Sequence, residues 1–243
     1  MYDITLFSIF RDSQGYLERY LNQVLGVFEL IGGKCRAVWL EGDSIDNTKH
    51  ILIKAKRQLK EWGYDVTLVH YNHGGPHWAS EPNKDRWHVL ANCWNKCLNL
   101  IKPTKYTMVV ESDLIYNSEI VFDLIRKLDE DHHVIYPLLL VDRSLEKFPF
   151  EYYYDTWGFT REGKHFIHEP PYWPTSKNLI EENELLEITT GGGMILSTYD
   201  IQIKGLFDQT CCVMKYPSDI KLFAHKECKI YHPVPNHWGL RNE

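Results

Sequence analysis

The sequence predicts an α/β protein with a mostly parallel, Rossmann-like sheet flanked by helices, followed by an irregular, aromatic-rich C-terminal region. Two observations predict this class. Short apolar runs alternate with segments of helical periodicity through residue 140, which is typical of parallel strands joined by helical crossovers. Acidic clusters follow two of these runs, at 41–46 and 111–113. Because ligands bind beyond the carboxyl ends of parallel strands, the two clusters mark the expected site.

Five short apolar runs are expected to form buried strands. They are Asp3–Phe10, Cys35–Leu40, Asp65–Tyr71, Tyr106–Val110 and His133–Leu140. Between them, apolar residues recur at helical spacing and predict four helices. These are about Gln14–Phe28, a segment carrying Ile51–Trp62, about Asp85–Leu100, and a segment from Asn117 or Ser118 to about Leu128.

Beyond residue 140 the alternation stops. We expect long irregular aromatic segments, a turn at Gly191-Gly192-Gly193, a short helix near Ser218–His225 and a final run rich in His and Pro. No low-complexity linker and no internal repeat separates this part from the first. A single domain over residues 1–243 is therefore predicted, with one half at 1–140 and the other at 141–243.

Composition limits the possible partners. The formal net charge is −6, which disfavours a nucleic-acid binder that relies on bulk electrostatics. Aromatic residues make up 14% of the chain, and their flat faces suit stacking on sugars or bases, although a large aromatic core explains them equally well. The six cysteines form no regular framework. With no signal peptide and no membrane-length apolar run, a reducing cytoplasmic location is expected.

The acidic motif Glu111-Ser112-Asp113 carries the clearest chemistry. It directly follows the apolar run that ends at Val110. Two carboxylates one residue apart at a strand end can share a hard cation, and Mn²⁺ or Mg²⁺ is typically held by such carboxylates together with substrate phosphates. The alternative is an ordinary solvated turn. Among twelve His, His237 is the best further metal ligand and His232 the second.

The ordered set of motifs resembles the GT-A glycosyltransferases, with some similarity to family-2-like enzymes and to fungal mannosyltransferases. The resemblance extends over nearly the whole chain. The matching segments are Phe7–Asp12, Glu41–Thr48, Arg86 with the helix after it, Glu111–Asp113, Gly191–Met194, Pro217–Ile220, His237–Gly239 and, for the mannosyltransferases, Tyr154–Phe159.

The resemblance implies a role for residues in these segments. Residues that would contact a nucleotide sugar are Arg11, Glu41, Asp43, Arg86, Ser112, Gly191, Gly192 and Gly193. Glu111, Asp113 and His237 would hold the metal. Gly42 stands where a second acidic residue is common, so Glu41, Asp43 and Asp46 all remain candidates for the base and ribose. The three glycines let a backbone approach a ligand closely, or simply form a tight turn.

The catalytic base is expected to be Asp219, with Asp155 as the alternative. Asp219 lacks the Glu that often precedes it in the family, and a plain capping role at a helix start explains it equally well. As a base it would favour inversion of the anomeric centre, whereas the similarity to mannosyltransferases favours retention. Both outcomes stay open.

The implied activity is transfer of a hexosyl or pentosyl group from a UDP- or GDP-sugar to an acceptor hydroxyl, assisted by Mn²⁺ or Mg²⁺. Residues 1–140 would bind the nucleotide sugar and 141–243 would form the acceptor side. The acceptor could be a glycan, a lipid, a protein or, less favoured by charge, a modified DNA base. A nucleotidyltransferase and a non-catalytic carbohydrate-binding protein are the alternatives. The first normally has a basic Gly-rich loop after its first strand, and the second seldom needs two acidic clusters at one sheet edge.

Overall fold

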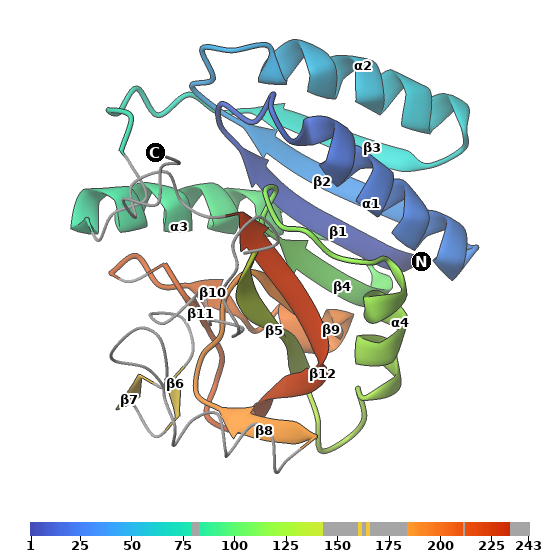
Figure 1. The fold of residues 1–243 in the computed structure, drawn as a ribbon, viewed down its shortest axis with the longest axis vertical. Helices are drawn as coiled ribbons and strands as arrows, with labels where there is room; N and C mark the ends of the chain where they lie inside the picture. The colour runs from blue at the N-terminus through green and yellow to red at the C-terminus, as the bar shows by residue number, and fades with distance from the viewer. Residues whose placement is uncertain (79–82, 143–159, 162–163, 166–183, 211, 234–243) are drawn as a thin grey trace.

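The structure, a computed structural model, describes residues 1–78, 83–142, 160–161, 164–165, 184–210 and 212–233. A central sheet runs through the molecule, with helices on both of its faces (Figure 1). Its eight strands are β1 (Tyr2–Phe10), β2 (Cys35–Glu41), β3 (Asp65–His70), β4 (Thr104–Val110), β5 (Val134–Asp142), β8 (Leu185–Ile188), β9 (Met194–Thr198) and β12 (Leu222–Pro233). Two small hairpins pair β6 (Thr160–Arg161) with β7 (Lys164–His165) and β10 (Leu206–Phe207) with β11 (Met214–Lys215).

The strand order across the sheet is β3-β2-β1-β4-β9-β5-β12-β8. Parallel pairing joins β3 to β2, β2 to β1, β1 to β4 and β5 to β12. The antiparallel pairs are β4 with β9, β9 with β5, and β12 with β8. This mixed α/β arrangement confirms the predicted fold class. It also places the carboxyl ends of β1, β2, β4 and β12 at one edge of the sheet.

The helices follow the predicted crossovers closely. They are α1 (Leu17–Ile31), α2 (Thr48–Glu61), α3 (Lys84–Leu98), α4 (Glu119–Arg126) and the short α6 (Tyr199–Gln202). α1 lies in front of the sheet and α3 behind it (Figure 1). Tyr20 of α1 donates its hydroxyl to Ser8 of β1, while Cys97 of α3 lies against the backbone of β1 and β2. Among the described helices, none combines the length and the apolar character needed to cross a membrane.

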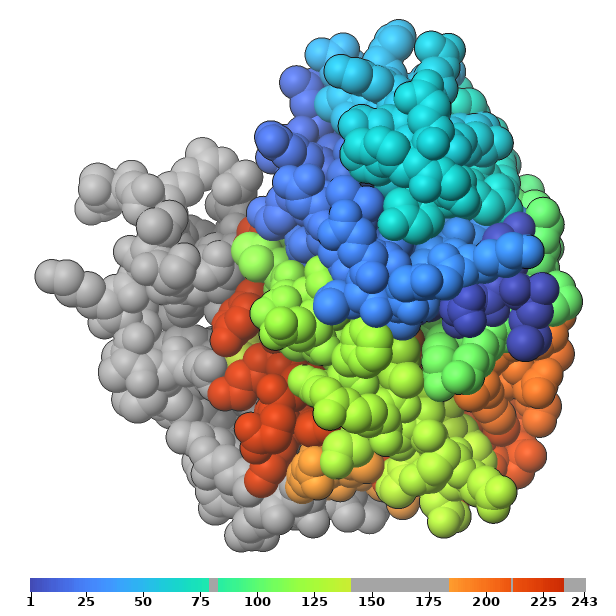
Figure 2. Space-filling model, turned by 90° about the vertical axis from the view of Figure 1, so that its right-hand side faces the viewer, coloured from blue at the N-terminus to red at the C-terminus, as the bar shows by residue number. Residues whose placement is uncertain are grey.

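The second half of the chain completes the sheet that the first half begins. β9 inserts between β4 and β5, and β12 lies on the other side of β5. In Figure 2 the red atoms of β12 lie beside the yellow-green atoms of the α4 region, and α4 contacts β12. Segments more than 100 residues apart in the chain therefore share one surface.

The prediction of a short helix near Ser218–His225 is wrong. Residues 217–220 form a turn, closed by the N–H of Ile220, which donates to the carbonyl of Pro217 at 3.0 Å, and β12 begins at Leu222. Leu222 and Ala224 are buried, and the strand is paired on both sides over 222–225. Tertiary pairing thus decides the conformation of a segment whose local pattern is ambiguous. The aromatic segments at 151–157 and 170–173 lie outside the described residues.

Candidate functional site

The acidic motif after β4 meets a histidine from the last strand. The N–H of Glu111 donates to the carbonyl of Gly193 at 2.9 Å. Ile115 and Tyr231 then exchange two backbone hydrogen bonds, at 2.7 and 2.8 Å. This pairing holds the loop after β4 against the end of β12. It places Nε2 of His232 3.0 Å from Oδ2 of Asp113.

These side chains have the geometry of a cation site. Glu111, Asp113 and His232 each offer one ligand atom, and the three atoms lie within 4.8 Å of one another. Neighbouring ligands of an octahedral ion at about 2.1 Å are about 3.0 Å apart, which is the separation between Asp113 and His232. Carboxylate oxygens suit Mn²⁺ or Mg²⁺, and a neutral imidazole can join two carboxylates at Mn²⁺. Within the described ranges no other group of three His, Cys, Asp or Glu converges in this way.

The electrostatics of the cluster favour a positive charge in it. Burial alone lowers the pKa of His232, but Asp113 and Glu111 outweigh this effect and raise it. Nδ1 of His232 also lies 2.5 Å from the carbonyl oxygen of Pro233, so both ring nitrogens face oxygen atoms. Burial alone raises the pKa of Asp113, yet His232 and Arg19 hold it below its ordinary value. A carboxylate beside a cationic partner is therefore the stable state of this pair.

At two of the three glycines after β8, neighbouring side chains leave no room for a Cβ atom. The sequence alone does not reveal this packing. Gly193 has a φ of +75°, and a Cβ there would lie 2.8 Å from Leu139. A Cβ on Gly191 would lie 2.4 Å from the ring of Tyr136. The turn can thus press against β5 while the carbonyl of Gly193 fixes the first residue of the acidic motif. Gly192, between them, accepts the N–H of Met194 at 2.9 Å.

Ser112, between the two carboxylates, is buried. Arg19 of α1 donates from Nη2 to the carbonyl of Asp113 at 2.7 Å and so supports the same loop from the other side. Neither the role of Arg19 nor the choice of His232 is visible in local sequence. Both depend on contacts between elements that are distant in the chain.

Glu41 and Asp43 lie at the same sheet edge as Glu111, on the far side of β1. Two strand spacings of about 4.8 Å separate β2 from β4, so the two acidic clusters are about 10 Å apart across the sheet. The Glu41 carboxylate is buried and lies 2.8 Å from Nδ1 of His70. Asp43, which has a φ of +57°, accepts the N–H of His73 at 2.9 Å and lies 3.0 Å from its Nε2.

The segment 72–78 is held by Asp12 together with Arg11 and Asp43, two residues predicted to contact a nucleotide. Arg11 donates from Nη1 to the carbonyl of Pro76 at 3.1 Å, and Asp12 lies 3.0 Å from His77. Beyond this segment, Arg86 lies in the first turn of α3, where the side chain of Asn83 accepts its N–H at 3.1 Å. Arg11 and Asp43 thus border the segment 72–78, and Arg86 lies at the start of α3.

Asp46 has a local role. Its carboxylate accepts the N–H of Thr48 at 2.9 Å and that of Gln14 at 3.0 Å, and these bonds hold its pKa below the ordinary value although burial opposes them. It therefore links the start of α2 to the loop after β1.

The structure does not bring Asp219 to the cluster. Its side chain is exposed in the turn before β12, whereas His232 lies near the other end of that strand. The nine residues of β5 that pair alongside span on the order of 25 Å. The helix start expected at Asp219 is a turn, so a capping role there is wrong as well. Asp155 and His237 lie outside the described residues.

Comparisons with solved structures identify the fold as the GT-A fold of nucleotide-sugar glycosyltransferases. The chain is similar to GalNAc-T7 with UDP, GalNAc and Mn²⁺, at a TM-score of 0.59 and 13% identity over 99% of this chain. It is similar to a mannosyltransferase, PcManGT from Pyrobaculum calidifontis in complex with GDP-Man and Mn²⁺, at a TM-score of 0.52 and 9% identity over 90% of this chain. It is also similar to S. aureus TarS 1-349 in complex with UDP, at a TM-score of 0.51 and 14% identity over 96% of this chain.

The likeness is one of fold. The chain covers 45% of the GalNAc-T7 chain, 56% of the mannosyltransferase chain and 60% of the TarS chain. No protein-family model and no curated protein sequence matches it.

Proposed function

We propose that the protein is a glycosyltransferase that moves a hexosyl or pentosyl group from a UDP- or GDP-sugar to an acceptor hydroxyl with the help of a divalent cation. The observation that carries this proposal is the convergence of Glu111, Asp113 and His232 at the carboxyl edge of a GT-A sheet. Relatives of the same fold are solved with UDP or GDP-mannose and, in two cases, Mn²⁺.

Each member of the cluster has a distinct part. Glu111 and Asp113 would supply carboxylate oxygens and His232 the neutral Nε2, with its Nδ1 proton directed at the carbonyl of Pro233, as is usual for ligating histidines. A bound Mn²⁺ or Mg²⁺ would neutralise charge that develops on the departing diphosphate. Arg19 keeps the loop rigid through its bond to the carbonyl of Asp113. His237, outside the described residues, remains a proposed additional ligand.

The nucleotide would occupy the edge between the two acidic clusters. Arg11 and Asp43 fix the segment 72–78, and we assign that segment as one wall of the pocket. Glu41 holds His70 at the base of this wall. Arg86 would contact the diphosphate, since its forked donors suit oxyanions. Ser112 and the glycine turn would line the sugar side, close to the cluster.

The acceptor hydroxyl needs a base. Asp155 is the remaining carboxylate of the two that were predicted, because Asp219 lies at the opposite end of β12 from the cluster. The acceptor itself would be a glycan, a lipid or a protein. A net charge of −6 gives a nucleic-acid acceptor less support.

The test is a thermal-shift titration with UDP and GDP, each with and without Mn²⁺. At 100 times its dissociation constant a ligand adds about 2.7 kcal/mol, which is about 5–10 °C for a chain of this size. We expect one diphosphate to give such a shift only when Mn²⁺ is present, and Asp113→Asn to lose it. Asp200→Asn, an exposed acid on α6, is the matched control and should keep it.

A metal-independent shift, or one that survives Asp113→Asn, would overturn the assignment of the cation. Neither alternative function is favoured by the fold. A non-catalytic carbohydrate-binding protein should release no sugar from a nucleotide sugar, whereas slow Mn²⁺-dependent hydrolysis of the matching donor is expected of a transferase without its acceptor. A nucleotidyltransferase would instead release pyrophosphate from a nucleoside triphosphate.

A further inference from the structure

The helix α2 is strongly basic, although the chain as a whole is acidic. Its charged residues are one acid, Glu61, and five cations, Lys49, Lys54, Lys56, Arg57 and Lys60. The helix therefore has a net charge of +4, while the whole chain has a formal net charge of −6. Figure 1 shows α2 beside β3, at the end of the sheet opposite β8. We call these five cations the basic face of α2.

The basic face points away from the protein core. The helix buries its other side, which consists of Thr48, Leu52, Ala55 and Leu59, and contacts β3. Four of the five cations are exposed, and Lys56 is half-buried. Within the described part of the chain, none of the five makes an ion pair or a side-chain hydrogen bond. Five positive charges thus face solvent without a counter-charge.

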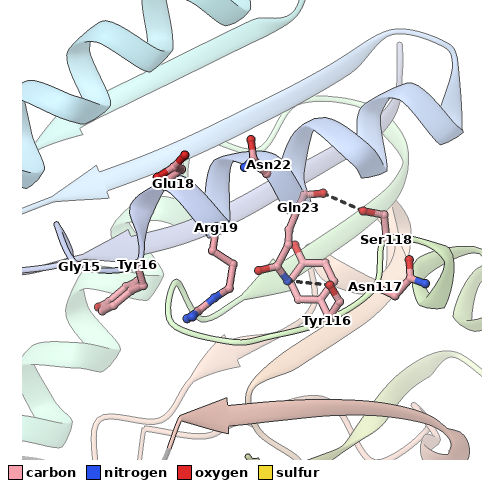
Figure 3. A pocket seen from close by; sticks show the side chains of 9 residues that line it. All are labelled: Gly15, Tyr16, Glu18, Arg19, Asn22, Gln23, Tyr116, Asn117 and Ser118. Carbon is pink, nitrogen blue, oxygen red and sulfur yellow. Dashed lines mark hydrogen bonds between the residues drawn. The ribbon is translucent and has the colours of Figure 1, made fainter.

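Cations on the neighbouring elements are placed differently. Arg19, the single cation of α1, turns toward the loop that carries Tyr116 (Figure 3) and donates to the carbonyl of Asp113 at 2.7 Å. Arg36 of β2 is buried, with its Nε 3.3 Å from Oδ2 of Asp65. Both have partners within the fold, whereas the cations of α2 do not.

The pattern on α2 works against the stability of the helix. Residues three or four positions apart are neighbours on a helix, and like charges there repel. Three such pairs occur on the basic face: Lys54 with Arg57, Lys56 with Lys60, and Arg57 with Lys60. Lys49 adds a positive charge in the first turn, which has no acid and lies at the positive end of the helix dipole. A polyanionic partner would convert this repulsion into attraction.

The side chains of the basic face favour a lipid surface over a nucleic acid. Four of the five cations are lysines, which act as point charges, whereas the forked donors of arginine suit specific phosphate recognition. Ile53 lies among them, four residues after Lys49 and three before Lys56. It is only partly buried, and it does not belong to the apolar side chains that pack against the described core. An apolar side chain among lysines suits the boundary between headgroups and acyl chains.

Exposed apolar side chains also stand at both ends of the helix. Ile45, just before it, is 84% exposed, and Trp62, just after it, is 51% exposed. Tryptophan is enriched where proteins meet the membrane–water interface. A helix of 14 residues is about 21 Å long, so the charges are spread along a line that suits a flat anionic surface.

We propose that the basic face of α2 binds the surface of an anionic phospholipid bilayer. Because the apolar side of α2 is packed in the protein, the helix would lie on the headgroups without inserting. The acidic remainder of the chain is repelled by the same surface, which fixes the orientation of the molecule with α2 toward the lipid. Three strand spacings separate β3 from β4, so the cation cluster stays clear of the bilayer. The inference does not depend on transferase activity.

The test is co-sedimentation of the full chain with vesicles, without metal or nucleotide. One set of vesicles contains phosphatidylcholine alone, and the other contains phosphatidylcholine with about 30% phosphatidylserine. We expect binding to the second set only, and release when NaCl is raised from about 0.1 M to about 0.5 M. The variant Lys54→Gln/Arg57→Gln/Lys60→Gln should bind on the order of 100-fold more weakly, about fivefold for each charge removed. It should melt at an unchanged or higher temperature, because it relieves repulsion.

The matched control removes three exposed lysines elsewhere, as Lys102→Gln/Lys105→Gln/Lys204→Gln. It changes the net charge by the same amount and should bind within about threefold of wild type. Ile53→Ala should weaken vesicle binding by about threefold, since it removes apolar surface from the contact. It should not lower the melting temperature, because alanine favours a helix and Ile53 does not pack against the core.

Three results would overturn the proposal. The wild-type chain binds neither set of vesicles or both equally, or the control variant loses as much binding as the α2 variant. The third result is tight binding of a 20-base-pair DNA duplex together with equal vesicle binding by wild type and Ile53→Ala, which would assign the basic face to nucleic acid. Asp113→Asn should bind vesicles as wild type does, so failure of the metal-linked thermal shift leaves these outcomes unaffected.

Discussion

Two sets of carboxylates and histidines lie at one edge of the same sheet, and they are built differently. At the β1–β2 end each carboxylate has its own imidazole: Glu41 pairs with His70, Asp43 with His73 and Asp12 with His77. At the β4–β12 end two carboxylates share one imidazole, that of His232.

The difference shows that a cation site requires ligand atoms that converge on one point. A large number of carboxylates and histidines at one edge is not enough. The first set has more histidines, but its pairs are spread along a loop, and Asp43 also accepts backbone N–H groups of that loop. Each carboxylate is held by its own imidazole or by the loop backbone, so this set fixes the segment 72–78. In the second set, ligand atoms of two carboxylates and one imidazole lie within 4.8 Å of one another. Such a convergence of ligand atoms on one point is what a divalent cation requires.

The largest expected effect is at His232. His232→Ala removes one ligand of three, and changes even outside the ligand shell typically cost 10–100-fold in metal affinity. We therefore expect the apparent dissociation constant for Mn²⁺, measured by isothermal titration calorimetry, to rise by at least about 10-fold. His73→Ala, in the other set, should leave it within about twofold. Equal losses in both variants would contradict the distinction between the two sets.

The next effect is on stability, at the glycine turn that supports the second set. Gly193→Ala places a Cβ 2.8 Å from Leu139 on a backbone with a φ of +75°. Such strain costs about 1–3 kcal/mol, or about 2–12 °C in melting temperature for a chain of this length. Gly15→Ala, where a Cβ meets nothing within 4 Å, is the control for differential scanning calorimetry. A melting temperature for Gly193→Ala equal to that of the control would show that the turn does not depend on this glycine.

The smallest effect is the pH dependence contributed by the first set. Burial, helped by Arg11 and His77, holds the pKa of His73 below its ordinary value although Asp43 opposes this. The unfolded chain then binds a proton more readily, so the stability from His73 is complete above about pH 6.5 and is lost as pH falls through its lower folded pKa.

Urea unfolding at pH 7.5 and pH 5 measures this dependence. His73→Gln should lose less free energy of unfolding over this interval than wild type, by under about 1 kcal/mol. His50→Gln, an exposed histidine on α2, should behave as wild type. A larger loss in His73→Gln than in wild type would reverse the sign and contradict the lowered pKa of this partly buried imidazole.

The sequence predicted the first half of the fold because local pattern and tertiary structure agree there. The runs predicted at Cys35–Leu40 and Tyr106–Val110 are β2 (Cys35–Glu41) and β4 (Thr104–Val110), within two residues at each end. In the second half they disagree. β9 and β12 pair with strands that lie about 90 residues earlier in the chain, and short-range periodicity carries no information about such pairings. The helix predicted at Ser218–His225 failed for this reason.

The candidate site divides in the same way. Glu111 and Asp113 could be identified because both follow one strand directly. His232 was the second choice among the histidines, since its approach to Asp113 depends on the bridge between Ile115 and Tyr231. No feature of the segment around His232 indicates that contact. The only general signal was topological: the end of a strand parallel to β4 must lie at the same edge of the sheet.

The most direct measurement of the central claim is pulsed EPR of Mn²⁺ bound to the protein, which detects a nitrogen atom coordinated to the ion. In protein that carries His237→Ala, which removes the other proposed imidazole, the ion should show a ¹⁴N coupling from one imidazole, and adding His232→Ala should abolish it while weaker Mn²⁺ binding persists through Glu111 and Asp113. A ¹⁴N coupling that survives in His232→Ala and disappears in His73→Ala would place the cation in the other set of carboxylates and contradict the account.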